Sequence, residues 1–259
     1  MVKQKVDKRA KTINLKSNSN KEFFLIHGYT GSPTDFNNLP YYLNKRFNAN
    51  VKVIRLKGHG EKIDNIDDLK YEDFFLQAEN ELKKDIKNGM QIVIGGISMG
   101  SFIALHLASK YPIKGIFNIS IPYKNKFLTE IVAFVEPLIP KKHWKKTISD
   151  DEKELRAHGF FYDTNIKGLN ILKKAKKELK KALKKITAPS FIIHVLEDKI
   201  FHLNGVISVQ KNINSHVNEI FIFDGKKAGH NPFYSPNHKE LYNLIGDFVE
   251  KNNLFEKIK

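Results

Sequence analysis

Ser98 lies in a Gly-Ile-Ser-Met-Gly pentapeptide, which matches the G-x-S-x-G pattern of a serine nucleophile. An apolar run at residues 91–95 precedes it, and an apolar series with helical periodicity at residues 102–108 follows it. This order predicts a strand, a sharp turn that carries the serine, and a helix. Such a turn strains the backbone and needs small residues two positions before and after the serine, where Gly96 and Gly100 stand. The pattern therefore predicts a serine placed for nucleophilic attack.

A serine of this kind needs an acid and then a histidine further along the chain. The expected strand at 190–196 leads into Glu197 and Asp198, and the expected strand at 219–223 leads to His230. Both groups follow strand ends, where open α/β sheets place their chemistry. Either carboxylate could be the acid, because the sequence does not fix the register at the strand end.

His230 is the favoured base because it lies in a Gly-His loop beyond the last predicted strand. The competing histidines, which we expect on the surface or in packing positions, are His194, His202, His216 and His238.

A glycine-containing loop, His-Gly-Tyr-Thr-Gly-Ser-Pro at residues 27–33, follows another apolar run. Glycines in such a loop free a backbone N–H to face a developing negative charge, and the residue after the nucleophile supplies a second N–H. We therefore assign the two donors of an oxyanion hole to the backbone N–H groups of Tyr29 and Met99. Their side chains are expected to line the acyl pocket.

Taken together, these motifs resemble those of the α/β-hydrolases, and more narrowly those of small bacterial carboxylesterases and monoacylglycerol lipases. The resemblance is nearly full length and includes Leu-Lys-Gly-His-Gly at 56–60, Lys-Ile-Thr-Ala-Pro at 185–189 and Ala-Gly-His at 228–230. One departure is Ser101, where many relatives carry a third glycine.

The resemblance implies that Ser98 is the nucleophile, His230 the base and Asp198 the acid, and it favours Asp198 over Glu197. In that mechanism the histidine takes the serine proton as the serine attacks an ester carbonyl, the acid orients the imidazole, and water releases the acyl group.

Strands and helices are expected to alternate, which predicts a mostly parallel sheet with helices on both faces, the α/β-hydrolase fold, as a single domain over residues 1–259. The expected strands lie near 12–16, 22–27, 51–56, 91–96, 115–120, 190–196 and 219–223. The expected helices lie near 34–46, 71–87, 98–110, 169–186, 204–213 and 238–252.

The stretch at about 122–168 breaks this alternation and is expected to be a small inserted cap over the active site. Its apolar residues at 127–139 have helical spacing. These residues could equally line the acyl site or be buried in the core.

The net charge of +16 is concentrated in part at 173–185, where lysines alternate with apolar residues at helical spacing. One interpretation is weak contact with an anionic membrane surface. The other, which is favoured because the fold needs a helix there, is a helix that covers the sheet and exposes its lysines. No nucleic-acid motif accompanies the charge, so no specific nucleic-acid partner is expected.

Further features exclude other classes of protein. The chain has no cysteine, no apolar run of membrane-spanning length and no apolar segment of a signal peptide, so a cytoplasmic location is the default expectation. His59, between two glycines, is expected to be a loop histidine at the rim of the cleft, because no metal-ligand spacing surrounds it. No metal and no cofactor are expected.

The predicted function is thus a serine esterase that acts on small-molecule esters with small to medium acyl chains, including monoacylglycerols. The alternatives are a non-hydrolytic ligand-binding or membrane-surface-binding protein on the same fold, and an enzyme that uses another acyl acceptor or cleaves another acyl bond. The ordered serine, acid and histidine argue against a non-hydrolytic protein.

Overall fold

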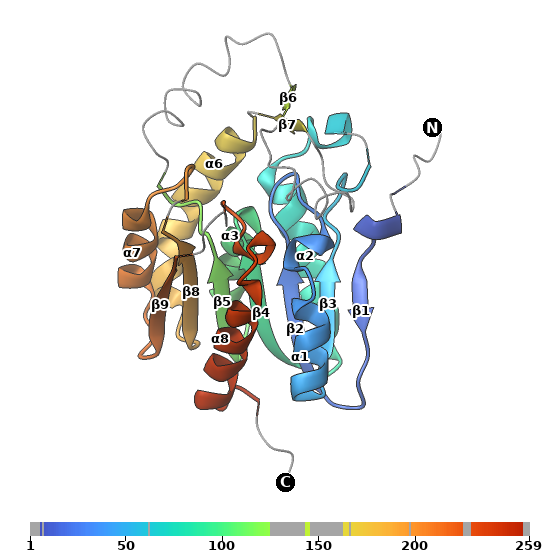
Figure 1. The fold of residues 1–259 in the computed structure, drawn as a ribbon, viewed down its shortest axis with the longest axis vertical. Coiled ribbons are helices and arrows are strands. Elements are labelled where there is room, and N and C mark those ends of the chain that lie inside the picture. Colours follow the sequence, from blue (N-terminus) through green and yellow to red (C-terminus); the bar gives the residue numbers. More distant parts are fainter. Residues whose placement is uncertain are drawn as a thin grey trace.

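The structure is a computed structural model that describes residues 6, 8–61, 63–124, 143–145, 163–165, 167–196, 198–224 and 229–255. A seven-stranded sheet of order β1-β3-β2-β4-β5-β8-β9 forms its centre (Figure 1). The strands are β1 (Ile13–Leu15), β2 (Lys21–Ile26), β3 (Asn50–Ile54), β4 (Gln91–Ile97), β5 (Gly115–Ile119), β8 (Ser190–Val195) and β9 (Asn218–Phe223). Only β1 pairs antiparallel with its neighbour in this sheet, so the mostly parallel sheet expected from the sequence is confirmed.

Helices cover both faces of the sheet, as a buried parallel sheet requires. One face is covered by α2 (Tyr71–Lys87), α3 (Met99–Ala108), α6 (Lys167–Ala182) and α7 (Leu203–Asn212). The other face, in front in Figure 1, is covered by α1 (Leu39–Phe47) and α8 (His238–Lys251). Short 3-10 helices lie at η1 (Lys8–Ala10), η2 (Pro33–Phe36), η3 (Ile63–Ile66), η5 (Leu183–Lys185) and η6 (Pro232–Tyr234). The two faces enclose separate apolar clusters, so the inner strands β2, β3, β4, β5 and β8 are buried on both sides, whereas the edge strands β1 and β9 are only partly buried.

The prediction of one continuous helix at 34–46 is wrong. The structure has the short helix η2, then Asn37 in the left-handed region with a φ of 48°, and then α1. A helix running through Pro40 would lack one hydrogen bond and would press the proline ring against the carbonyl of Phe36. The break places η2 beside the glycine-containing loop at 27–33.

The expected cap at about 122–168 falls largely outside the described residues, and so does its apolar series at 127–139. Within the stretch, the short strands β6 (His143–Lys145) and β7 (Asp163–Asn165) form an antiparallel pair.

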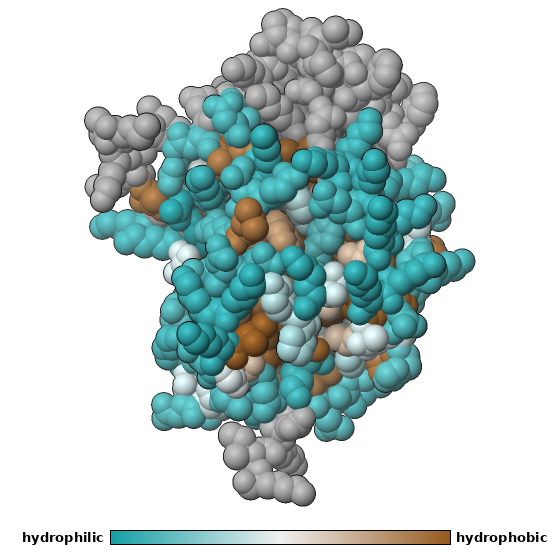
Figure 2. Space-filling model, turned by 180° about the vertical axis from the view of Figure 1, so that it is seen from behind, coloured by the Kyte–Doolittle hydropathy of each residue, from teal (hydrophilic) through white to brown (hydrophobic). Residues whose placement is uncertain are grey.

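The lysine-rich segment forms α6 and η5, as expected. Its apolar positions are buried against the sheet layer, and its lysines are mostly exposed. The buried apolar residues are Leu172, Ala175, Leu179 and Leu183. Figure 2 looks onto the side of the molecule opposite α1 and α8, where hydrophilic residues dominate the surface. None of the helices in the described ranges is both long and apolar enough to cross a membrane.

A buried charge cluster lies at the other end of the sheet from the carboxyl ends of the parallel strands. Lys52 on β3 contacts both carboxylate oxygens of Asp85 on α2, at 2.6 and 2.5 Å, and Glu22 on β2 hydrogen-bonds to the same aspartate. Burial, followed by the charge of Asp85, raises the pKa of Glu22 to about 8. At neutral pH the cluster thus retains a proton that the unfolded chain releases.

Stability should therefore depend on pH through Glu22. Its pKa is raised on folding, so its contribution to the free energy of unfolding is complete below about pH 4.5 and is lost as pH rises through about 8. The variant Glu22→Gln, which cannot titrate, should match the wild type in acid and exceed it at pH 9 by up to about 4 kcal/mol. Urea unfolding of both proteins from pH 5 to 9 checks this. Parallel curves across that range would contradict it.

Candidate active site

The sharp turn predicted around Ser98 is present at the carboxyl end of β4. Ser98 joins β4 to α3 and has a φ of 52° and a ψ of −121°, a conformation that few residues other than glycine adopt. Its side chain makes no capping hydrogen bond to the helix and is only partly buried. The strained backbone thus carries a hydroxyl group that does not cap the helix.

The two flanking glycines allow this turn because the chain passes close to itself there. A methyl group at Gly96 would lie 2.4 Å from the carbonyl of Gly100, and one at Gly100 would lie 2.0 Å from the carbonyl oxygen of Ile26. Real side-chain carbons do not approach backbone atoms so closely. Ser101, at the place of a third glycine, fits because its Oγ donates to the carbonyl oxygen of Gly96 at 2.8 Å.

Asp198 and His230 are brought together from two neighbouring strand ends. Asp198 follows β8, His230 follows β9, and the Nδ1–H of His230 donates to Oδ2 of Asp198 at 2.7 Å. The other carboxylate oxygen, Oδ1, accepts hydrogen bonds from the backbone N–H groups of Ile200, at 2.8 Å, and Phe201, at 3.1 Å. The carboxylate is therefore fixed on both oxygens. Glu197 lies outside the described residues.

The surroundings keep Asp198 ionised. Burial alone would raise its pKa, because its side chain is fully inaccessible to solvent. The charge of His230 and three hydrogen bonds outweigh burial and hold the pKa of Asp198 below its usual value. A carboxylate that stays charged fixes the imidazole with its proton on Nδ1.

This arrangement leaves the other ring nitrogen of His230 available. Its Nε2 atom is buried and has no hydrogen-bond partner among the residues that the structure describes. Within the described residues no hydrogen bond joins it to Ser98, although both lie at the carboxyl edge of the sheet. Contacts of this kind are often long in a free enzyme and shorten when substrate is bound.

The loop at 28–31, which we call the Gly28 loop, lies beside Ser98. A methyl group placed on Gly28 would lie 3.4 Å from Cβ of Ser98. Met99 is the first residue of α3, so its N–H has no partner within the helix. The backbone N–H of Tyr29 also lacks a hydrogen bond among the described residues. Among the described residues, neither of the N–H groups assigned from the sequence has a hydrogen-bond partner; Met99 follows Ser98 in the chain, and Tyr29 follows Gly28, which lies beside Ser98.

The competing histidines lie elsewhere. His202 and His216 are exposed, and His238 donates from Nδ1 to the carbonyl oxygen of Ser235. His194 is buried within β8. The expectation that His59 lies at the rim of the cleft is wrong, because this side chain is fully buried and its Nε2 accepts from the N–H of Thr30 at 3.2 Å. No cluster suited to a metal ion occurs in the parts of the chain that the structure describes.

Asp35 is a site residue that the sequence did not reveal. Its carboxylate accepts from the N–H of Gly28, at 2.9 Å, and from the hydroxyl of Tyr234, at 3.3 Å, while its carbonyl oxygen accepts from Nδ2 of Asn231 at 3.0 Å. It therefore connects the Gly28 loop to the loop that carries His230. A carboxylate four residues after the last loop glycine, in Gly-Ser-Pro-Thr-Asp, was the available signal, but turns commonly contain aspartate.

Together, the fold and the site define an α/β-hydrolase. A family model described as serine aminopeptidase, S33, matches residues 17–234, and the chain belongs to this family of α/β-hydrolases.

Solved structures support the fold assignment. A structure reported with LipS and LipT, two metagenome-derived lipolytic enzymes, is similar with a TM-score of 0.83 at 19% identity, over 95% of this chain and 100% of that one. The monoacylglycerol lipase of Paleococcus ferrophilus has a TM-score of 0.73 at 16% identity, over 93% and 98%. A soluble variant of monoglyceride lipase from Saccharomyces cerevisiae has a TM-score of 0.73 at 15% identity, over 97% of each chain.

Proposed function

We propose that this hydrolase cleaves carboxylic esters through an acyl-enzyme on Ser98. The observation that carries the proposal is the pair of Asp198 and His230, which are joined at 2.7 Å and leave a buried Nε2 that has no partner in the described part of the chain. A group in that state can accept one proton and return it, as the base of acyl transfer must.

The proposal gives each of these residues one role. His230 Nε2 takes the proton of Ser98 as the serine oxygen attacks the ester carbonyl, and the oxyanion that forms accepts hydrogen bonds from the N–H groups of Tyr29 and Met99. The protonated imidazole is stabilised by Asp198 and donates its proton to the leaving alcohol. Water then attacks the acyl-enzyme by the same route and releases the acid.

Esters with small to medium acyl chains, including monoacylglycerols, are the proposed substrates. The support is the nearly full-length likeness to lipolytic enzymes and monoacylglycerol lipases. The family description favours a second candidate, cleavage of an amino-terminal peptide bond, which the same three residues could catalyse.

Two substrate series distinguish these candidates. One is p-nitrophenyl esters from acetate to palmitate, and the other is amino-acid p-nitroanilides. The proposal expects ester turnover within about 1–10³ s⁻¹, with an optimum along the series, and far slower release from the anilides. Preference for the anilides would establish the peptidase, and no turnover of either series would favour a binding protein. If an added alcohol yields a new ester faster than water yields the acid, the enzyme is an acyltransferase.

We further propose that the exposed lysines of α6 provide weak contact with anionic membranes. Lys177 and Lys181 are both exposed on this helix, whereas its apolar positions are buried in the core and cannot enter a bilayer. Binding would thus be electrostatic and would weaken with salt. The cytoplasmic location expected from the sequence stays a prediction.

Vesicle sedimentation tests this contact. The double variant Lys177→Glu with Lys181→Glu should lose binding to phosphatidylglycerol vesicles at low salt. The charge-matched control, Lys45→Glu with Lys239→Glu, changes exposed lysines of α1 and α8 on the opposite face and should keep binding. Equal losses in both double variants would show that net charge alone, rather than α6, attracts the protein to the vesicles.

A further inference from the structure

The peptide group between Gly28 and Tyr29 is held in one orientation. Its carbonyl oxygen accepts a hydrogen bond from Nδ1 of His27 at 2.9 Å and another from the N–H of Gly31 at 3.2 Å. In a trans peptide the N–H points opposite to the carbonyl. The Tyr29 N–H is therefore directed away from these donors.

The N–H groups on both sides of Tyr29 have buried side-chain partners. That of Gly28 donates to Asp35, and that of Thr30 donates to Nε2 of His59. Both acceptor side chains are buried, so water does not compete for these bonds. Of the three successive N–H groups, only that of Tyr29 has no hydrogen-bond partner within the described residues.

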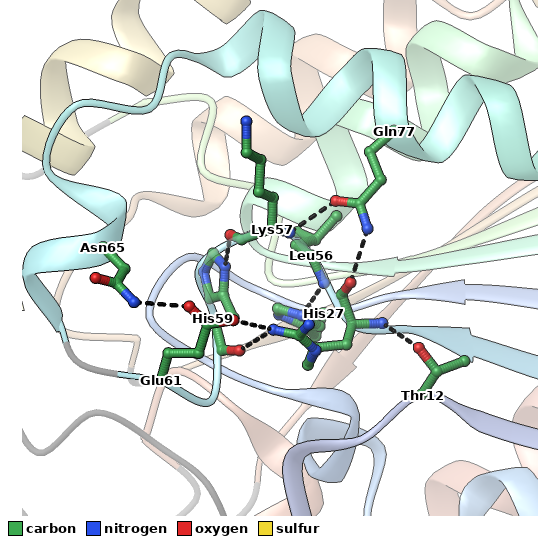
Figure 3. Close-up of polar contacts among 9 residues, drawn as sticks. Thr12, His27, Leu56, Lys57, His59, Glu61, Asn65 and Gln77 are labelled. Atoms are coloured by element: carbon green, nitrogen blue, oxygen red, sulfur yellow. Dashed lines mark hydrogen bonds and ion pairs between the residues drawn. The ribbon is translucent and has the colours of Figure 1, made fainter. Parts of the chain in front are cut away.

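The bonds to His27 determine its protonation state. Its Nε2 accepts from the backbone N–H of Leu56 at 3.0 Å, so the ring is neutral and carries its proton on Nδ1. Burial, and next the neighbouring His59, hold the pKa of His27 well below its usual value. Figure 3 shows His27 beside Leu56 and His59, within a polar network that also includes Lys57 and Gln77.

We infer that His27 is a positioning residue for the oxyanion hole. Its Nδ1–H orients the Gly28–Tyr29 peptide and, by donating to that carbonyl, polarises the amide so that the Tyr29 N–H becomes a stronger donor. The inference rests on the proposed function, because it concerns the negative charge that develops during ester cleavage. His27 itself does not contact the reacting atoms.

Two substitutions of His27 separate its effect on the orientation of the Gly28–Tyr29 peptide from its effect on packing. In His27→Asn the amide NH₂ occupies the place of Nδ1 and keeps the bond to Gly28, while the bond from Leu56 is lost. In His27→Gln the amide oxygen reaches the place of Nε2 and keeps the bond from Leu56, while the bond to Gly28 is lost. Asparagine leaves a buried N–H with no partner, whereas with glutamine the Gly28 carbonyl keeps its bond from Gly31. If His27 contributed only to packing, His27→Asn should therefore be less stable and less active than His27→Gln.

The inference expects the opposite order in catalysis. With a p-nitrophenyl ester, kcat should fall about 10- to 100-fold in His27→Gln with little change in KM, because an N–H donor that is less firmly oriented and less polarised loses part of its contribution to the transition state. His27→Asn should keep kcat within about fivefold of the wild type, a threshold below the cost of losing one oxyanion donor, even if it melts at a lower temperature. A lower kcat in His27→Asn than in His27→Gln would overturn the inference while leaving the esterase intact.

A second measurement does not depend on turnover. The ¹⁵N NMR spectrum of histidine-labelled protein, assigned with the His27→Asn variant, should show His27 neutral with the proton on Nδ1 throughout pH 6 to 8. A proton on Nε2, or titration within that range, would overturn the inference even in an active enzyme. A wild type without esterase activity would instead refute the proposed function, and the oxyanion role of His27 with it.

Discussion

Replacing Ser98 by alanine should lower kcat for ester hydrolysis by about 10⁴-fold or more, since the acyl-enzyme can no longer form. The protein should fold normally, because the Ser98 side chain makes no capping hydrogen bond and alanine tolerates the strained φ no worse than serine does. Steady-state kinetics with the preferred p-nitrophenyl ester, together with a thermal melt of each protein, checks both statements.

Ser109→Ala is the matched control for this variant. Ser109 caps the other end of α3, where its Oγ donates to the carbonyl oxygen of His106 at 2.7 Å. Its loss should lower the melting temperature slightly and leave kcat within about twofold, as expected of a surface substitution. Substantial ester turnover in Ser98→Ala would show that another group is the nucleophile.

Replacing Asp198 by asparagine should lower kcat by about 10⁴-fold, the magnitude reported for the same change in a serine protease triad. Because two backbone N–H groups donate to Oδ1, the asparagine must place its oxygen there and direct its NH₂ at His230. Nδ1 of His230 must then accept rather than donate, which moves the ring proton to Nε2. An Nε2–H cannot take a proton from Ser98.

Glu197→Gln is the comparison for this variant, because the sequence alone allowed either Glu197 or Asp198 to be the acid. It should leave kcat within about threefold, because the proposal gives Glu197 no part in acyl transfer. Kinetics of both variants, with circular dichroism to verify folding, makes the test. A large loss in Glu197→Gln and a small one in Asp198→Asn would assign the acid to Glu197.

The sequence predicted the sheet well because burial on both faces gives parallel strands continuous apolar runs. Residues 91–97 and 190–195 are mainly apolar runs of this kind, and the chain after them leads to Ser98 and Asp198 of the candidate site. The turn at Ser98 was also predictable, because only glycine fits at positions 96 and 100. The helix expected at 34–46 is divided in the structure, because Pro40 fits the first turn of α1 and not the interior of a longer helix.

The roles of Asp35 and His59, which hold the loops of the site together, could not be predicted from the sequence. The bonds of Asp35 join residues 28, 231 and 234, and those of His59 reach residue 30, so both depend on how distant loops meet. No local pattern distinguishes such a buried carboxylate or imidazole from an ordinary loop residue. His27 lies in a motif that the sequence analysis identified. Its proposed role depends on a neutral ring, which is fixed by the hydrogen bonds to the N–H of Leu56 and the carbonyl oxygen of Gly28.

Covalent labelling by a fluorophosphonate tests the central claim most directly, because the reagent reacts with a serine that a neighbouring base activates. Intact mass spectrometry should show one adduct per chain, and peptide mapping should place it on Ser98. The adduct should be absent from Ser98→Ala and should form much more slowly in Asp198→Asn. A wild-type protein that stays unlabelled, or an adduct on another residue, would contradict the assignment of Ser98 as an activated nucleophile.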